Sequence, residues 1–153
     1  CANGTTTTGP RLTHGAPTLE ALGSAVWSAI AARDTAALER LRLTESEHNE
    51  LVWPEQPAAR EPSAAANLGF WWQNIQRRNR AAPDDLFAAH GGSRLDLREV
   101  ACDGEPEEYE SFTALTDCRL VLEGPTGPFR LEAFRYVIRM DGVHKVVRYY
   151  GDE

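Results

Sequence analysis

The sequence lacks the long apolar run of roughly 20 residues that a membrane-spanning helix requires. It also lacks a surplus of positive charge, since 16 Lys and Arg stand against 23 Asp and Glu, which gives a net charge of -7 at pH 7. A general nucleic-acid binder needs that surplus to neutralise phosphates, so we exclude this class of protein. The same deficit argues against adsorption to anionic lipid through charge alone.

Motifs for metals and phosphates are missing as well. The histidines, His14, His48, His90 and His144, are scattered without an HExxH-type spacing, and His48 is expected on a solvated helix face. The acidic stretch 103–110 lacks the spacing of an EF-hand. It is predicted to be a solvated loop, with an acidic docking patch and a Ca²⁺ site as the alternatives. We therefore predict no metal and no cofactor, and we assign no catalytic residue.

The composition predicts one folded domain behind a flexible N-terminal segment. Of the 153 residues, 42% are hydrophobic and 25% are charged, which is typical of a globular domain. The first residues after Cys1 are small and polar, and they include the run Thr5 to Thr8. Such a composition stays flexible, so we expect a tether at residues 1–17 and a single domain at residues 18–153.

The first residue is itself informative, because a cysteine at the start of a mature chain resembles a bacterial lipoprotein. In that class Cys1 carries the lipid, and several acyl chains together hold the protein firmly on a membrane. The alternative is a trimmed chain that happens to begin at this cysteine. On the lipoprotein interpretation, we expect the protein on the extracytoplasmic, periplasmic face of a bacterial membrane.

Two further cysteines, Cys102 and Cys118, lie in neighbouring strand-like segments. Thiols outside the cytosol tend to oxidise, and adjacent strands bring cysteines within bridging distance. We predict a disulfide between them. The alternative is a pair of buried free thiols that act as small hydrophobic side chains.

Two helices are predicted near the N-terminus. Apolar residues recur at helical spacing from Leu19 to Ile30, directly after Thr18. Asp34 then provides a good N-cap for a second, short helix that continues the apolar face through Leu41. The pattern therefore indicates a long helix, a short break and a shorter helix.

A third helix is predicted from a capping box formed by Thr44 and Glu47. It should end near Trp53, because Pro54 cannot continue a helix. A turn-rich connector follows, from residue 54 to residue 62.

A fourth helix is predicted from a cap at Ser63 through Arg80. The arginines near its predicted end, at positions 77, 78 and 80, suit the negative end of a helix and need no ligand to explain them. Pro83 is expected to begin a separate short helix, which the Gly91–Gly92 pair terminates.

After Gly92 the apolar period changes from helical to strand-like. Four runs have this character, at residues 94–102, 112–123, 129–140 and 143–150. The last three predict an antiparallel meander, with Asp141–Gly142 as a tight hairpin turn. Helices followed by strands predict an α+β fold with a curved antiparallel sheet of about four strands, and not a parallel βαβ sheet.

Three features resemble one family. They are the stretch AVWSAIAARDTAALERL with Asp34 at its break, the hairpin FRYVIRMDGVHKVVRYY, and the order of helices before a meander from Thr18 to Tyr150. Together they are similar to the nuclear transport factor 2-like superfamily, the cystatin-like α+β cone. The resemblance implies a curved sheet wrapped around the first helix. It also implies a cone pocket, for which the candidates are Trp27, Trp72, Phe134, Tyr136 and His144, with plain core packing as the alternative for each.

The resemblance implies two kinds of function, because enzymes of this family act inside the cone with an Asp or His base and a Tyr or acid that steadies an enolate oxygen. Tyr136 and Tyr149 could donate to such an oxygen, but no acid or His matches the family's base. We therefore expect a non-catalytic lipoprotein that binds another protein, as an accessory or assembly subunit of a membrane complex. The alternatives are a small-ligand binder or an isomerase- or cyclase-like enzyme that uses the cone interior, and a purely structural module.

Overall fold

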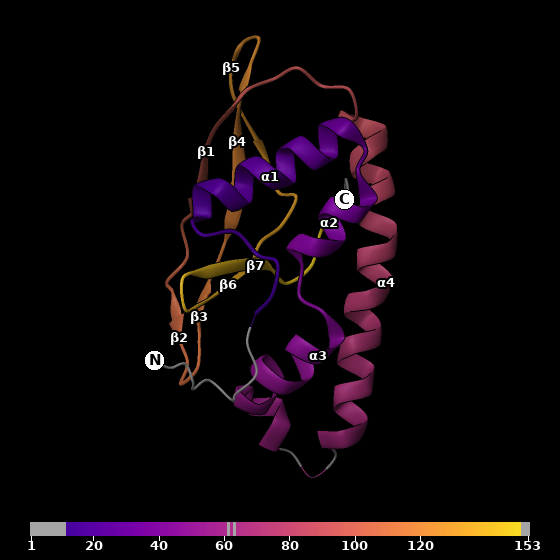
Figure 1. The fold of residues 1–153 in the computed structure, drawn as a ribbon, viewed down its shortest axis with the longest axis vertical. Coiled ribbons are helices and arrows are strands. Elements are labelled where there is room, and N and C mark those ends of the chain that lie inside the picture. The colour runs from indigo at the N-terminus through magenta and orange to yellow at the C-terminus, as the bar shows by residue number, and fades with distance from the viewer. Residues whose placement is uncertain (1–11, 61, 63, 151–153) are drawn as a thin grey trace, which may run out of the picture.

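The computed structural model describes residues 12–60, 62 and 64–150. Cys1 and the proposed lipid attachment, most of the expected tether, and the cap at Ser63 lie outside the described residues. The chain is α+β, with helices that pack against two antiparallel sheets (Figure 1). The predicted class and the antiparallel character of the strands are therefore confirmed.

The first two helices are α1 (Leu19–Ala32) and α2 (Thr35–Leu41). The side chains of Thr18 and Asp34 cap them, and each accepts a hydrogen bond from the backbone N–H of the third residue after it. The break between the helices is made by Arg33, whose left-handed backbone (φ 55°) ends α1. The predicted helix, break and helix are confirmed.

The next segment is a series of short helical turns: α3 (Glu45–Glu47), the π-turn η2 (His48–Val52), and the 3₁₀ turns η3 (Trp53–Glu55) and η4 (Pro57–Arg60). The capping box at Thr44 is present in full, as predicted. The predicted helix from Thr44 to about Trp53 is α-helical only over Glu45–Glu47, and the π-turn and a 3₁₀ turn continue the helical course to Glu55. Pro54 lies in the first turn of η3, where its missing N–H is tolerated, so it does not end the helical course as predicted.

The helix α4 (Ala64–His90) is a single element of 27 residues that contains Pro83 in its interior. The prediction of two separate helices here is wrong. An internal proline costs about 3 kcal/mol or more. However, the buried residues Trp72, Ala82 and Leu86 continue one helical stripe past it. Continuous packing of this stripe on the rest of the molecule holds the helix together, and α4 runs along the whole side of the fold (Figure 1).

The strands form two sheets, in the orders β1-β4-β5 and β2-β3-β6-β7. Their bounds are β1 Leu97–Cys102, β2 Glu107–Glu108, β3 Thr113–Leu115, β4 Cys118–Gly124, β5 Gly127–Leu131, β6 Val137–Met140 and β7 Val143–Val146. All pairs are antiparallel. The stretch expected to be an acidic loop thus contains the short strand β2.

Two of the predicted strand runs are each broken in the middle. The run 112–123 divides into β3 and β4 at Asp117, which adopts a left-handed backbone (φ 55°). The run 129–140 divides into β5 and β6. One backbone hydrogen bond, from Cys118 N to Arg135 O at 2.9 Å, joins the two broken runs across this bend. Each run therefore contributes one strand to each sheet, and in the first run the left-handed backbone of Asp117 makes the change of direction.

The hairpin between β6 and β7 agrees with the prediction. Asp141 (φ 52°) and Gly142 (φ 77°) form the turn, and Met140 pairs with Val143. Two successive residues with positive φ are the requirement of a type I′ turn, which glycine meets without a steric penalty.

The N-terminal segment 12–17 packs on the domain. Ala16 pairs with His144 of β7 through backbone hydrogen bonds of 2.9 and 2.8 Å, and Leu12 is buried in a small apolar cluster with Phe112 and Ile138. The larger core lies between α1, α2, the end of α4 and the sheet of β1 and β4. There Gly23 brings α1 so close to β1 that a Cβ would overlap the Val100 side chain.

Candidate functional site

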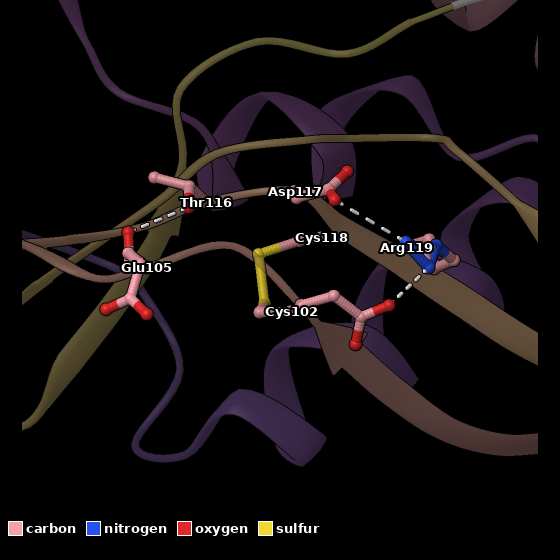
Figure 2. Close-up of a disulfide and its surroundings, with 7 residues drawn as sticks. Cys102, Glu105, Thr116, Asp117, Cys118 and Arg119 are labelled. Carbon is pink, nitrogen blue, oxygen red and sulfur yellow. Dashed lines mark hydrogen bonds and ion pairs between the residues drawn. A yellow bond between two sulfur atoms is a disulfide. The ribbon is translucent and has the colours of Figure 1, made fainter.

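The predicted disulfide between Cys102 and Cys118 is present and joins residues that face each other across β1 and β4. Figure 2 shows the bridge beside the strand bend, where Arg119 forms ion pairs with Asp103 at 2.8 Å and Asp117 at 3.8 Å. The alternative of two free thiols does not hold. The disulfide and the two ion pairs of Arg119 lie at the same bend, which indicates a structural role for this cluster.

A buried ion pair ties the N-terminal segment, α3 and β7 together. Lys145 is 1% exposed and donates to Glu47 Oε1 at 2.8 Å. Glu47 also accepts hydrogen bonds from the backbone of Thr13 (2.7 Å) and Thr44 (2.9 Å). Burial opposes ionisation of Glu47, but Lys145 and the two backbone donors outweigh it, so the pKa of this carboxyl lies below its ordinary value.

Three of the five residues predicted for a cone pocket are buried in the body of the fold. Trp27 and Phe134 belong to the main core, and Trp27 donates its indole N–H to Leu95 O at 2.8 Å. His144 is buried on β7 with its Nδ1 3.3 Å from Ala16 O, and burial lowers the pKa of its imidazole.

The other two candidates, Trp72 and Tyr136, line two different pockets. Trp72 lies in a polar pocket between α3 and α4. Tyr136 lies in a larger and more apolar groove, which does not include Trp72. The structure therefore does not gather the five predicted residues at a single pocket.

The larger groove has a volume of about 770 Å³ and lies between α4, the turns η2 and η3, and the chain around β6 and β7. We call it the aromatic groove, after the side chains that dominate its lining: Trp53, Trp71, Tyr136 and Tyr150. Arg78 and Arg148 also line it. A groove with aromatic walls and two cationic side chains can hold an apolar group that carries a negative charge.

Two of these aromatic side chains are unusually open to solvent. Trp71 of α4 is 45% exposed, and Tyr136 before β6 is 43% exposed. Tyr150 is buried beneath two guanidinium groups, with Arg148 Cζ 4.2 Å and Arg135 Cζ 4.1 Å from its ring centre. The stacked arginines hold positive charge beside the groove although the chain as a whole is acidic.

His48 forms part of the same groove and is buried, which corrects the expectation of a solvated histidine. Its ring lies 5.3 Å from that of Trp72 and 6.3 Å from that of Trp53, and its Nδ1 is 3.0 Å from Asn49 Oδ1. Burial lowers the pKa of His48, so its imidazole is neutral at pH 7. The sequence places it beside glutamates, but the π-turn rotates it toward the two tryptophans.

Sequence reasoning did not single out Trp71, Trp53, Tyr150 or Arg148 as site residues. One signal was present in the sequence: Phe70, Trp71 and Trp72 are consecutive in a helical pattern. Three successive helical positions point in different directions, so they cannot all face one core. The structure buries Trp72 and leaves Phe70 66% exposed.

No family model, curated protein or solved structure matches the chain. Within residues 12–60, 62 and 64–150, no helix is both long and apolar enough to cross a membrane. In the same part of the chain, no three His, Cys, Asp or Glu side chains gather where they could hold a metal ion. The function must therefore be inferred from the groove itself.

Proposed function

We propose that the chain is a non-catalytic binding module that holds a segment of another protein in the aromatic groove. One observation carries this proposal: Trp71 and Tyr136, each more than 40% exposed, line the same groove. Tryptophan and tyrosine bury a large area at a small entropic cost, and they dominate the binding energy of many protein interfaces. Exposed apolar side chains that gather at one groove, and are not scattered singly, often mark an interaction site.

The charges around the groove favour a partner segment that is both apolar and acidic. Arg148 and Arg78 line the groove, and the Arg148 guanidinium is fixed over the ring of Tyr150. A partner carboxylate could pair with the Arg148 guanidinium while an apolar side chain covers Trp71. A basic segment would instead meet like charge at this position.

The disulfide supports a location outside the cytosol, because such bridges persist in oxidising compartments. We therefore propose a role as an accessory or assembly subunit of an extracytoplasmic membrane complex. We also propose that the two sheets act as one curved, cystatin-like sheet around α1. The hydrogen bond from Cys118 to Arg135 across the bend and the close contact of Gly23 with β1 support this cone-like arrangement.

A second function, the binding of a small amphipathic ligand, is favoured by the size of the groove. Its volume of about 770 Å³ lies within the range of roughly 300–1,000 Å³ typical of ligand sites. Neutral His48 and the hydroxyl of Tyr136 would then provide polar contacts in the same groove. The two functions differ in the size of what occupies the groove, so a cross-linking experiment distinguishes them.

The experiment replaces Trp71 with the photo-reactive amino acid benzoylphenylalanine in the protein's own cells. Phe129 on β5 provides the matched control, because it is about as exposed as Trp71, at 42%, but does not line the groove. Its ring lies 6.0 Å from that of His90. We expect a discrete protein adduct from position 71 and none from position 129. If neither position, or both positions equally, gave protein adducts, the proposal would be overturned. A small added mass at position 71 alone would support the ligand-binding alternative.

A further inference from the structure

The positive charge of the arginines on α4 is not explained by a position at the negative end of the helix, as the sequence suggested. Arg77 and Arg80 were expected at a helix end, but α4 continues to His90, so they lie in its interior. The effect of the helix dipole is confined to the last turn and does not reach them. Moreover, the stretch from Ala64 to Pro83 contains no acidic residue, although the chain has a net charge of -7. Within the described chain, Arg80 forms no ion pair.

These arginines line a second pocket, of about 510 Å³, between α3 and α4. We call it the donor pocket, because the α4 residues that line it carry hydrogen-bond donors: Trp72, Gln73, Gln76, Arg77 and Arg80. Positions 72, 76 and 80 lie one above the other on a helix, as do 73 and 77, so their side chains converge on one face. The donor pocket is distinct from the aromatic groove, with which it shares Asn74.

One of the donors is buried without an acceptor. Trp72 is 6% exposed, and its indole N–H has no hydrogen-bond partner among the described residues. Trp27 is equally buried, but its indole N–H has an acceptor, because it donates to Leu95 O at 2.8 Å. A buried donor without an acceptor is rare in folded proteins and needs an explanation, of which a water or an ion that accepts its hydrogen bond is one.

We propose that the donor pocket binds an oxyanion, either a carboxylate or a phosphate group. Arg80 provides an unpaired positive charge, and Arg77 donates to Asn74 Oδ1 at a long 3.3 Å, which leaves most of its guanidinium available. An oxyanion accepts several hydrogen bonds at once, and the indole N–H of Trp72 would be one of its donors. This inference does not rest on the aromatic groove or on its proposed protein partner.

Glu45 of α3 lies on the opposite wall of the pocket. Its negative charge should affect anion affinity in the direction opposite to that of the arginines. Its carboxylate repels a bound anion, so its removal should strengthen oxyanion binding. Removal of an arginine should weaken it. If the pocket held only solvent, neither substitution would change the response to added anions.

The test follows the indole N–H signals of the four tryptophans by NMR while inorganic phosphate, acetate or, as control, chloride is added at matched ionic strength. Trp72→Phe assigns the Trp72 signal, and the Trp27 signal reports that the fold is unchanged. We expect a saturable shift of the Trp72 signal with phosphate, acetate or both, and the responding anion identifies the group that the pocket prefers. Trp27 should not move.

The variants then test the donors. Arg77→Gln with Arg80→Gln should weaken the anion affinity by at least about tenfold, because two charged hydrogen-bond donors are lost. Glu45→Gln should tighten the affinity by about twofold or more, since an exposed charge interacts weakly through water. The proposal is overturned if the Trp72 signal responds to neither anion, responds equally to chloride, or keeps its full response in the arginine variant.

Discussion

Replacement of Glu47 by Gln tests the buried ion pair that joins three parts of the fold. The substitution preserves the shape of the side chain but removes the charge opposite Lys145, which is 1% exposed. Glu47 Oε2 also accepts from the backbone N–H of Thr13 at 2.7 Å and from its hydroxyl at 3.1 Å. A glutamine amide offers one oxygen in place of two, so Lys145 or Thr13 must lose its acceptor.

The expected cost follows from this geometry. Breaking a buried pair by removing one partner costs about 3–5 kcal/mol, because the remaining charge is left in the core without compensation. We therefore expect Glu47→Gln to lower the free energy of unfolding by about 3–5 kcal/mol. Adding Lys145→Met should recover about 2 kcal/mol of this loss, because it removes the uncompensated ammonium and fills its space with an apolar side chain.

The assay is urea unfolding of the wild type, both single variants and the double variant, followed by tryptophan fluorescence with the disulfide intact. Together the four proteins form a double-mutant cycle, which isolates the coupling between the two side chains. A cost below about 1 kcal/mol for Glu47→Gln, or single-variant costs that simply add in the double variant, would refute the reasoning.

Three further predictions concern stability. The pKa of Glu47 lies below its ordinary 4.5, so the carboxylate's contribution to stability is complete above that pH and declines as pH falls through the folded-state pKa. Unfolding free energies measured from pH 7 to pH 3 should show this loss, and Glu47→Gln should lack that part of it. Cys102→Ala with Cys118→Ala should cost about 3 kcal/mol, because the bridge joins residues 16 positions apart and so restricts the unfolded chain; an unchanged urea midpoint would contradict this. Gly23→Ala should cost about 1–3 kcal/mol through overlap with Val100, whereas the same change at Gly69, where a Cβ meets nothing, should not destabilise the protein. Thermal unfolding of both variants checks the difference.

The features that could be predicted from the sequence depend on neighbours along the chain. The caps at Thr18 and Asp34, the capping box at Thr44 and the hairpin turn at Asp141–Gly142 are local hydrogen-bonding or backbone requirements. Each is satisfied within a few residues, so the pattern alone is sufficient to identify it.

The features that could not be predicted depend on contacts between distant segments. Pro83 normally ends a helix, but here the packing on both sides of it keeps α4 continuous. Asp117 bends a strand whose alternation looks regular in the sequence. Lys145 lies in an apolar run without any sign that Glu47, far away in the chain, compensates its charge.

The same reasoning applies to the candidate sites. The family resemblance implied a pocket lined by Trp27, Trp72, Phe134, Tyr136 and His144, and two of these, Trp72 and Tyr136, do line pockets. It could not show that these two residues lie in different pockets, because that depends on how α4 is rotated against η2 and η3. The exposure of Trp71 has the same origin.

The most direct test of the proposed binding function is the hydrodynamic mass of the protein purified from its own cells in mild detergent. We predict that the wild type elutes in a complex well above its own 16.9 kDa, and that Trp71→Ala with Tyr136→Ala releases a folded monomer. Phe129→Ala, which removes an equally exposed aromatic side chain elsewhere, should leave the complex intact. A wild type that elutes as a monomer, or a folded groove variant that stays in the complex, would contradict the account.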